Sequence, residues 1–514
     1  MTNPILITDP FWGYSILLRT IVYVLIPLFG ILQFVRLRRA LHVFQLEGYK
    51  RREFLSWCRA HRQRARFLTK PTAKKPLVMT GRAWRILITA TIVSILAVLV
   101  VPGVAHLFLG GWPADVGAWA AMTALVFFGT PRVLVVADQV MTPVQATING
   151  RFMRAAQTRL TKVEPLVVGV TGSFGKTSTK FAIERLIGRK EAVLATPGSF
   201  NTPLGVARTI NEHMTEAHRF FIVEMGAYGT GEIAELSGFV QPRIGVLTAI
   251  GPAHLERFGS MEAIRRAKYE LIEALPAGGT AVMNVDDPEV RALADKTSNV
   301  PVVRYGLKPE GSPDISAREV DLTPRGTTLT IVDSRNSDEL EVTTHLLGRH
   351  ALGHVLAATA VAIASGRSLV ELKTPIESLQ PVEHRLQIID GTGGVTVIDD
   401  AYNSNPEGAA AALEVLGSMP GHQKIVVTPG IVELGPLQHQ ANEVFGERAG
   451  QVADILIVVA RLNREAITAG AARSAGARVV TVDSLNEAQK ELATVLRAGD
   501  VVLFENDLPD QYED

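Results

Sequence analysis

Residues Leu166 to Ser178, LVVGVTGSFGKTS, decide the fold of this 514-residue chain. An apolar run predicts a buried strand, a glycine-rich turn follows, and Lys176 and Thr177 begin a helical pattern. This order forms a phosphate cradle, because glycines let backbone N–H groups close on phosphate oxygens and the helix N-terminus adds positive charge. In such a loop the lysine reaches the outer phosphates and the threonine hydroxyl binds Mg²⁺. We therefore expect nucleotide binding by Gly172, Ser173, Phe174, Gly175, Lys176, Thr177 and Ser178.

The spacing of this loop departs from the common form, because residue 170 is a valine and the first glycine is Gly172. The alternative is an ordinary tight turn with a chance Gly-Lys-Thr. The strand-turn-helix context favours the phosphate loop.

Strand and helix signals alternate after the loop. The apolar runs 220–224, 244–250 and 279–285 predict strands, whereas 322–342 has the period-two pattern of a hairpin. This rhythm is typical of an α/β domain with a mostly parallel sheet, in which ligands bind beyond the carboxyl ends of strands. A second alternation starts at about Glu383. We expect a central P-loop ATPase domain over 151–381 and a C-terminal Rossmann-like α/β domain over 382–514.

Composition excludes several classes of protein. The formal net charge of +1 argues against a globally basic nucleic-acid-binding protein, so we expect no nucleic-acid partner. The single cysteine, Cys58, excludes an internal disulfide framework and a CxxC metal site. Mean hydropathy is +0.19, which is high for a soluble enzyme. The excess of apolar residues lies in the first 140 residues.

Three apolar runs lie in residues 1–150, at about 14–35, 86–109 and 116–137. The first two are long enough to cross a bilayer core of ~30 Å as helices, and the third could be re-entrant or interfacial. The connection between the first two is rich in Lys and Arg, which places it in the cytoplasm by the positive-inside rule. We expect N-terminal transmembrane helices and a multi-pass protein of the cytoplasmic membrane, with membrane lipid as a partner and the catalytic domains facing the cytoplasm. Buried helices of a soluble protein are the alternative.

Five strings taken together resemble the Mur ligases, and most of all the branch that adds D-alanyl-D-alanine to the muramoyl tripeptide in peptidoglycan synthesis. They are TGSFGKTSTK, VEMGAYGTGEI from Val223, IGVLTAIGPAHLERFGSMEAIRRAKYEL from Ile244, EHRLQ from Glu383 and IDDAYNSNPEG from Ile398. The resemblance covers roughly residues 160 to 500 in order and leaves out the first 150.

The resemblance implies an ATP-dependent ligase of cell-envelope synthesis. A peptidyl carboxylate attacks the γ-phosphate of ATP, and an incoming amino acid or dipeptide amine then displaces phosphate from the acyl phosphate. It implies two Mg²⁺ ions and a carbamylated lysine at position 268, for which a plain surface lysine is the alternative. The implied catalytic residues are Lys176, Lys268, His254 and Asn201, the magnesium ligands are Thr177, Glu224 and His254, and the further nucleotide-binding residues are Arg385, Asp400 and Tyr402, with Asn403 a plausible neighbour.

Three departures from the family pattern concern substrate binding. Ala351 and His354 replace two asparagines of the adenine-contacting run, so adenine must be bound differently. The tail FENDLPDQYED, from Phe504, replaces a loop that bears lysine and glycine and helps bind the amine. The family's UDP-binding domain has no counterpart before residue 150, so we expect an acceptor presented at the membrane, for example as a lipid-linked precursor.

Two other functions remain open. One is a membrane-anchored ligase of the poly-γ-glutamate type, which the altered tail allows. The other is a non-catalytic nucleotide-binding scaffold, which the missing asparagines allow. Retention of both implied metal sites argues against the scaffold, because a scaffold needs no second metal.

Overall fold

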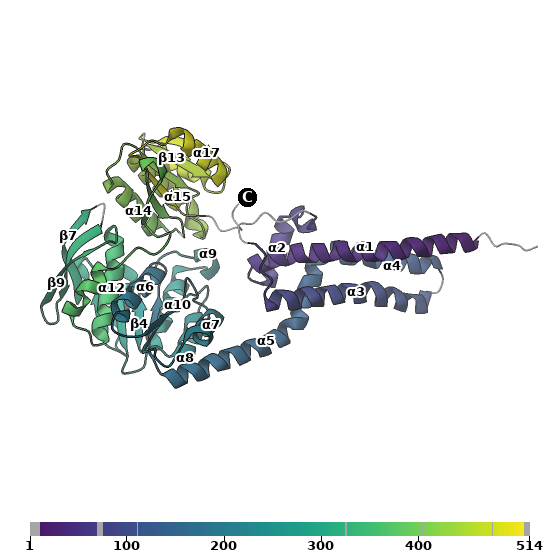
Figure 1. Cartoon of the computed structure of the whole chain (residues 1–514), viewed down its shortest axis with the longest axis horizontal. Coiled ribbons are helices and arrows are strands. Elements are labelled where there is room, and N and C mark those ends of the chain that lie inside the picture. The colour runs from purple at the N-terminus through teal and green to yellow at the C-terminus, as the bar shows by residue number, and fades with distance from the viewer. Residues whose placement is uncertain are drawn as a thin grey trace, which may run out of the picture. The chain divides into compact units, whose positions relative to one another are not determined.

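The computed structural model describes residues 11–68, 76–109, 112–323, 326–402, 404–474 and 476–507. The chain divides into two compact units, residues 1–150 and 151–514 (Figure 1). Each unit is described by itself.

The N-terminal unit is helical. Buried apolar side chains such as Leu41, Phe54, Leu87 and Leu134 bring four of its helices together in one small core. Its elements are α1 (Phe11–Leu46), α2 (Arg51–Ala60), the 3-10 helix η1 (Arg64–Arg66), α3 (Gly81–Leu109), α4 (Trp112–Phe128) and the first part of α5 (Thr130–Val163).

A buried carboxylate ties three of these helices together. Asp138 on α5 accepts hydrogen bonds from Arg51 Nε of α2 at 2.7 Å and from Arg82 Nη2 of α3 at 3.1 Å. The Asp138 side chain is only 6% exposed, so these two guanidinium groups supply the partners that a buried charge requires.

The expected multi-pass protein of the cytoplasmic membrane is wrong. Among the residues that the structure describes, one helical stretch, Gly81–Val100, is long and apolar enough to cross a membrane. The run 116–137 is not one straight span, because the chain bends by 79° between Gly117–Phe128 and Thr130–Val163. The run 14–35 lies in α1, but the side chains of residues 1–27 lie outside the described part. Apolar composition alone misled the prediction, since a third of the Gly81–Val100 window is buried against protein.

The central domain is built on a nine-stranded mixed sheet in the order β2-β3-β1-β4-β5-β6-β7-β8-β9. Neighbours from β2 to β7 are parallel, and β7, β8 and β9 form an antiparallel meander. Its strands are β1 (Leu166–Thr171), β2 (Val193–Ala195), β3 (Phe220–Glu224), β4 (Ile244–Leu247), β5 (Thr280–Asn284), β6 (Val302–Tyr305), β7 (Ile315–Thr323), β8 (Gly326–Asp333) and β9 (Asp338–Thr344).

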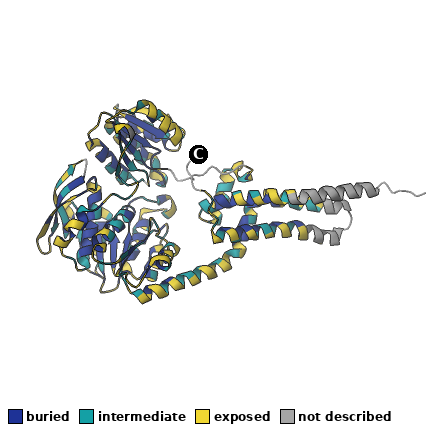
Figure 2. Ribbon diagram, in the orientation of Figure 1, coloured by how far each residue is buried: buried dark blue, intermediate teal, exposed yellow. Residues whose placement is uncertain are grey.

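Helices cover both faces of this sheet, which explains why β1, β3 and β4 are continuous apolar runs (Figure 2). One face carries α6 (Lys176–Gly188), α12 (Arg349–Ala364), η3 (Leu369–Leu372) and α13 (Lys373–Glu377). The other carries the end of α5 with α7 (Pro203–His213), α8 (Glu232–Val240), α10 (Met261–Glu273) and α11 (Pro288–Lys296); α9 (Leu255–Phe258) and η2 (Pro309–Gly311) are short.

Side-chain caps fix where several of these helices begin. Thr202 accepts from Gly205 N at the start of α7, and Ser260 accepts from Ala263 N at the start of α10. Asp287 caps α11 and is followed by a proline at the first helical position. Because α7 follows β2 and α11 follows β5, their caps also fix the loops at these strand ends.

The C-terminal domain has a six-stranded sheet in the order β10-β11-β15-β12-β13-β14, parallel except for β10. Its strands are β10 (Gln387–Asp390), β11 (Thr396–Asp400), β12 (Lys424–Thr428), β13 (Ile455–Val459), β14 (Arg478–Val482) and β15 (Val501–Glu505). α14 (Pro406–Ser418), α15 (Gln438–Val452) and α16 (Arg464–Ala471) pack on one face and α17 (Leu485–Val495) on the other; η4 (Thr392–Gly394) and η5 (Gly435–Leu437) lie in loops.

The α/β fold predicted after residue 150 is confirmed. The predicted hairpin at 322–342 is part of the three-stranded meander, which begins earlier, at Ile315. Strands β2, β6 and β10 were not predicted, because three or four residues give too short a pattern.

Candidate nucleotide and metal site

The loop between β1 and α6 takes a conformation that only glycine permits at two positions. Gly172 has a φ of +149°, and a Cβ there would lie 2.0 Å from Thr248 Oγ1. Gly175 has a φ of +78°, and its Cβ would lie 2.7 Å from His354 Cε1. The backbone therefore passes close to β4 and α12, and α6 begins directly after it with Lys176.

Two side chains of this loop fasten it to its neighbour. Ser173 Oγ donates to Gly251 O at 2.9 Å and accepts from Gly251 N at 3.0 Å. The Phe174 ring lies so close to Gly251 that a Cβ there would be 2.4 Å from it. Both side chains shape the loop, and Phe174 and Ser178 also line the cavity described below.

Lys176 lies folded over its own loop. Its Nζ donates to Gly172 O at 2.8 Å and to Ser173 O at 3.1 Å, where it is ready to exchange carbonyl oxygens for phosphate oxygens. Burial and the nearby charge of Arg385 lower the pKa of Lys176 to about 8, against the opposing effect of Glu224. The ammonium therefore remains mostly charged at neutral pH, as phosphate binding requires.

Glu224, at the end of β3, is the centre of a buried polar cluster. Its Oε2 accepts from Thr177 Oγ1 at 3.0 Å and from Lys180 Nζ at 3.1 Å, and its Oε1 accepts from Asn201 Nδ2 at 3.2 Å. The structure thus brings together three of the predicted residues, Thr177, Glu224 and Asn201. Lys180 was not predicted to act; its place one helical turn after Lys176 in GKTSTK is the sequence signal that could have found it.

Lys268 is buried on α10, with 3% of its surface exposed, and has no hydrogen-bond partner in the part of the chain that the structure describes. Burial and the charge of Lys176 lower its pKa to about 7. The alternative of a plain surface lysine is therefore wrong. A large fraction of this amine is uncharged at neutral pH and able to react with an electrophile.

His254 meets a carboxylate of the C-terminal domain. Its Nδ1 contacts Glu433 Oε2, its ring packs edge-on against Tyr228 with centroids 4.8 Å apart, and Arg257 lies over Tyr228. His254 and Glu433 both have positive φ, at +57° and +65°, a conformation that non-glycine residues hold at a cost. Sequence reasoning missed Glu433, since nothing in the sequence relates the loop after β12 to His254.

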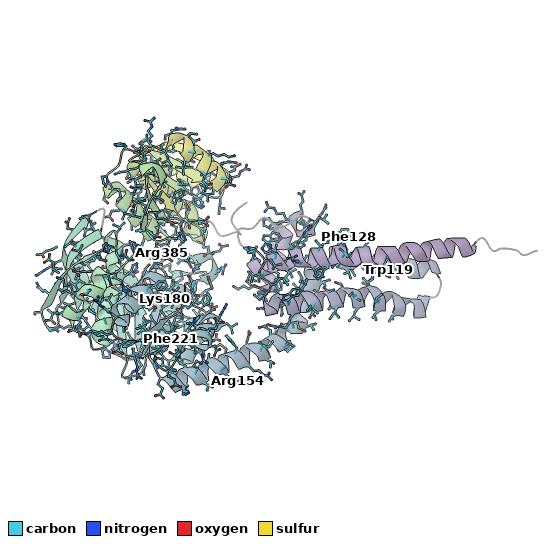
Figure 3. The ribbon with its side chains drawn as sticks, viewed as in Figure 1. Trp119, Phe128, Arg154, Lys180, Phe221 and Arg385 are labelled. Carbon is cyan, nitrogen blue, oxygen red and sulfur yellow. The ribbon has the colours of Figure 1, made fainter. Side chains whose placement is uncertain are left out.

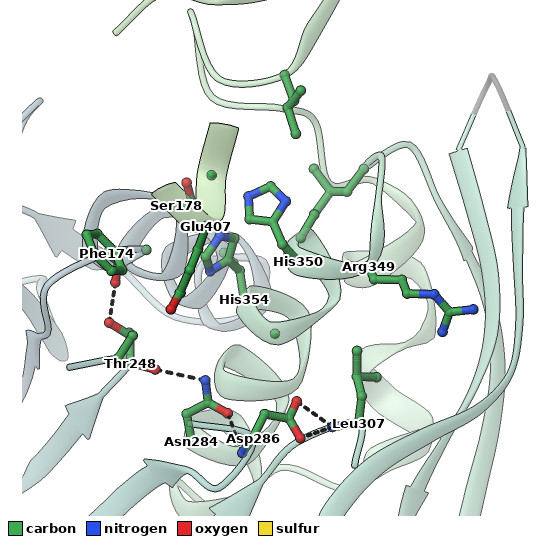
Figure 4. A pocket seen from close by; sticks show the side chains of 18 of the residues that line it. Phe174, Ser178, Thr248, Asn284, Asp286, Leu307, Arg349, His350, His354 and Glu407 are labelled. Atoms are coloured by element: carbon green, nitrogen blue, oxygen red, sulfur yellow. Dashed lines mark hydrogen bonds between the residues drawn. The ribbon is translucent and has the colours of Figure 1, made fainter. Parts of the chain in front are cut away.

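A cavity of about 1180 Å³ lies beside the phosphate loop, lined by both domains of the second unit. Figure 4 shows Phe174, Ser178, His350, His354 and Glu407 around it, with Asn284 and Asp286 below. Burial lowers the pKa of His350 to about 4 and that of His354 to about 3, so both rings are neutral. His354 Nδ1 lies 3.1 Å from Thr179 Oγ1, where the family pattern has asparagine. The size suits a nucleoside, and neutral rings can face a base without a charge penalty.

The C-terminal domain contributes Arg385 and Asp400 to this cavity. Arg385 also lies over the Tyr402 ring, 4.8 Å from its centroid. Burial raises the pKa of Asp400 to about 6 and that of the neighbouring Glu505, at the end of β15, to about 7. Tyr402 does not line the cavity; its hydroxyl contacts Ser199 Oγ instead. Asn403 and tail residues 508–514 lie outside the described residues.

The oxygen atoms at Thr177 and Glu224 fit Mg²⁺, a hard cation that uses one or two protein carboxylates together with substrate phosphates. No group of three or more His, Cys, Asp or Glu side chains able to hold a metal occurs within the described ranges. A second ion at His254 fits less directly, because Nδ1 already contacts Glu433.

Two family models match this chain, the Mur ligase middle domain over residues 170–362 and the Mur ligase glutamate ligase domain over 384–505. The UDP-N-acetylmuramoyl-tripeptide–D-alanyl-D-alanine ligase of Mycobacterium leprae is 34% identical over 368 residues, which cover 66% of this chain and 70% of that protein. The chain belongs to the Mur ligase family. The motif resemblance is thereby confirmed.

Two further Mur ligases are similar to this chain. The enzyme of the same name from Mycobacterium bovis is 35% identical over 314 residues, 60% of this chain and 59% of its own length, so this chain spans less than two thirds of that relative. The crystal structure of the MurF ligase from Thermotoga maritima in complex with ADP matches with a TM-score of 0.62 and 29% identity, covering 70% of this chain and 80% of that one. The relatives are named for a UDP-linked precursor, which gives no support to a multi-pass membrane location.

Proposed function

We propose that this chain is an ATP-dependent ligase that joins a muramoyl-peptide carboxylate to D-alanyl-D-alanine or a related amine through an acyl phosphate. The observation that carries the proposal is the cluster at the phosphate loop. Lys176 lies over the glycine-rich loop and Thr177 donates to Glu224, and burial together with the charge of Lys176 lowers the pKa of Lys268. The substrates in this proposal are the ones for which the relatives are named.

Phosphoryl transfer depends mostly on positioning and on neutralising charge. Lys176 would bind the transferring phosphoryl group, and Thr177 with Glu224 would hold Mg²⁺, which offsets charge on the phosphate oxygens. Asn201 would orient the acceptor carboxylate, and Arg385 would reach the phosphates from the C-terminal domain. His254 is proposed as a ligand of a second Mg²⁺ through its free Nε2.

Lys268 is proposed to carry CO₂ as a carbamate. The reaction needs an uncharged amine, and a pKa of about 7 supplies one at neutral pH. The product is an anion, which suits a position where the positive charge of Lys176 acts. Arginine or methionine at this position cannot form it.

The test is acceptor-dependent release of ADP by the purified full chain with ATP, Mg²⁺, UDP-linked muramoyl tripeptide and D-alanyl-D-alanine, with mass spectrometry of the product. We expect a product heavier than the acceptor by one dipeptide less water, and no release from Lys176→Ala. ADP release that ignores both acceptor and amine would contradict the proposal and favour the nucleotide-binding scaffold.

A second candidate is a ligase of the same mechanism with a different amine, as in the poly-γ-glutamate type. The tail FENDLPDQYED, from Phe504, favours it, because it differs from the lysine- and glycine-bearing loop that helps bind the amine in the family. A panel of amines, including glutamate and diamines, assayed with the same acceptor separates the two.

A further inference from the structure

Lys180 is a fully buried lysine whose partners lie on two other elements. The side chain is 0% exposed, on the first turns of α6 (Figure 3). Its Nζ donates to Glu224 Oε2 at the end of β3 and to the carbonyl oxygen of Gly198 in the loop between β2 and α7. A buried ammonium is retained only where its partners are fixed, so these contacts hold three elements in one arrangement.

The loop 197–202 is a meeting point for the parts of the proposed site. Gly198 accepts from Lys180, and Asn201 donates to the second oxygen of Glu224. Between them, Ser199 contacts Tyr402 of the C-terminal domain. The loop therefore reaches Glu224 through Lys180 at one end and directly through Asn201 at the other, and it contacts the C-terminal domain from its middle. A movement of Glu224 is therefore expected to move the loop 197–202 as well.

We propose that Lys180 is a positioning residue that locks the loop 197–202 to Glu224, so that Mg²⁺–nucleotide binding and acceptor binding are coupled. The acceptor half rests on the proposed function, in which Asn201 orients the carboxylate. The link that Lys180 makes between the loop and Glu224 does not rest on the proposed function, because it concerns only contacts within this chain. A cation held by Glu224 would share the oxygens that accept from Lys180 and Asn201, so both hydrogen bonds would transmit its binding to the loop.

The first test uses Lys180→Met, which keeps the length of the side chain and removes its charge, with Lys180→Arg as the charge-keeping variant. In the wild type, the acceptor KM is expected to fall as Mg²⁺ rises. In Lys180→Met we expect the acceptor KM to rise roughly tenfold and to lose that dependence, as loss of one hydrogen bond to a charged group implies. Lys180→Arg should restore part of the dependence. Lys162→Met, at a lysine that is 72% exposed, is the matched control.

The second test needs no substrate and guards against a misfolded single variant. Lys180→Met/Glu224→Gln removes both buried charges and is compared with Glu224→Gln alone, in which Lys180 still holds Gly198. We expect amide hydrogen exchange over residues 197–202 to be at least about tenfold faster in the double variant, with α7 beyond residue 205 unchanged.

Equal exchange in the two backgrounds, or an unchanged Mg²⁺ dependence of the acceptor KM in Lys180→Met, would overturn the inference. Failure of the wild type to show acceptor-dependent ADP release would overturn the proposed function instead. Exchange over 197–202 would then still decide whether Lys180 locks the loop.

Discussion

A substitution at Gly226 can displace the Asn201 side chain without replacing any polar residue. It follows β3, and a Cβ there would lie 2.7 Å from Asn201 Cγ and Nδ2 and 3.0 Å from Oδ1. Its φ is not in the left-handed region, so Gly226→Ala introduces no backbone strain. Only the amide end of Asn201 has to move.

The expected cost follows from the bond that is lost. Asn201 Nδ2 donates to Glu224 Oε1 at 3.2 Å, and a hydrogen bond to a charged group contributes about 1.5–3 kcal/mol. If Asn201 must be in place when the acceptor reacts, kcat/KM for the acceptor should fall roughly tenfold to a hundredfold. The melting temperature should change little, because the clash is relieved at the end of one side chain.

The assay is acceptor-dependent ADP release at saturating ATP, together with thermal unfolding. Gly238→Ala is the control, since a Cβ at this helical glycine meets no atom within 4 Å and should be neutral or slightly stabilising. A double-mutant cycle with Asn201→Ala isolates the cause. The reasoning is refuted if Gly226→Ala keeps wild-type kcat/KM, or if it lowers kcat/KM as much in the Asn201→Ala background.

Three further predictions concern other parts of the chain. Gly175→Ala should weaken ATP binding by at least about tenfold, because φ is +78° and His354 stands 2.7 Å from the new atom; equilibrium binding of a fluorescent ATP analogue measures it, and unchanged affinity would show that the loop can shift. Lys268→Met should stabilise the protein most at and below pH 7 and progressively less as the pH rises toward 10.5. Because burial lowers the folded-state pKa to about 7, the unfolded chain binds more protons between these pH values; denaturant unfolding as a function of pH tests the sign, and a gain that grows with pH would contradict it. Asp138→Ala should destabilise the N-terminal unit by about 3 kcal/mol, since it leaves two guanidinium groups without their buried partner, whereas Arg51→Ala should cost less because Arg82 remains; thermal unfolding compares them, and equal losses would argue against the shared carboxylate.

Sequence reasoning found the parts of the site that lie in one continuous pattern. The apolar run before Gly172 and the helix after Lys176 identify the phosphate loop, because glycine placement and helix polarity are local properties. The position of Glu224 at the end of an apolar run placed it at the edge of a parallel sheet where ligands bind, and the family resemblance implied its role as a magnesium ligand.

Residues that depend on long-range packing were missed. Lys180 looks like any lysine on an amphipathic helix until β3 and the loop 197–202 enclose it. Glu433 is distant in sequence from His254, and only docking of the C-terminal domain brings them together. Tyr402 was predicted beside the nucleotide, and its hydroxyl contacts Ser199 Oγ. The residues adjacent to it in the sequence do not determine the direction of a loop side chain. The membrane prediction failed for a related reason, since composition does not reveal which apolar helices bend or pack on protein.

The position of β15 sets the order in which the protein can become functional during synthesis. This strand is the last in the chain, yet it lies between β11 and β12 in the interior of its sheet. Until the ribosome has released it, β11 lacks a neighbour on one edge, and Asp400 at its end lacks the setting in which it lines the nucleotide cavity. The central sheet can be complete long before that moment. The C-terminal sheet is thus complete only once β15 has joined it, and a premature stop before Val501 leaves β11 and β12 without the strand that lies between them.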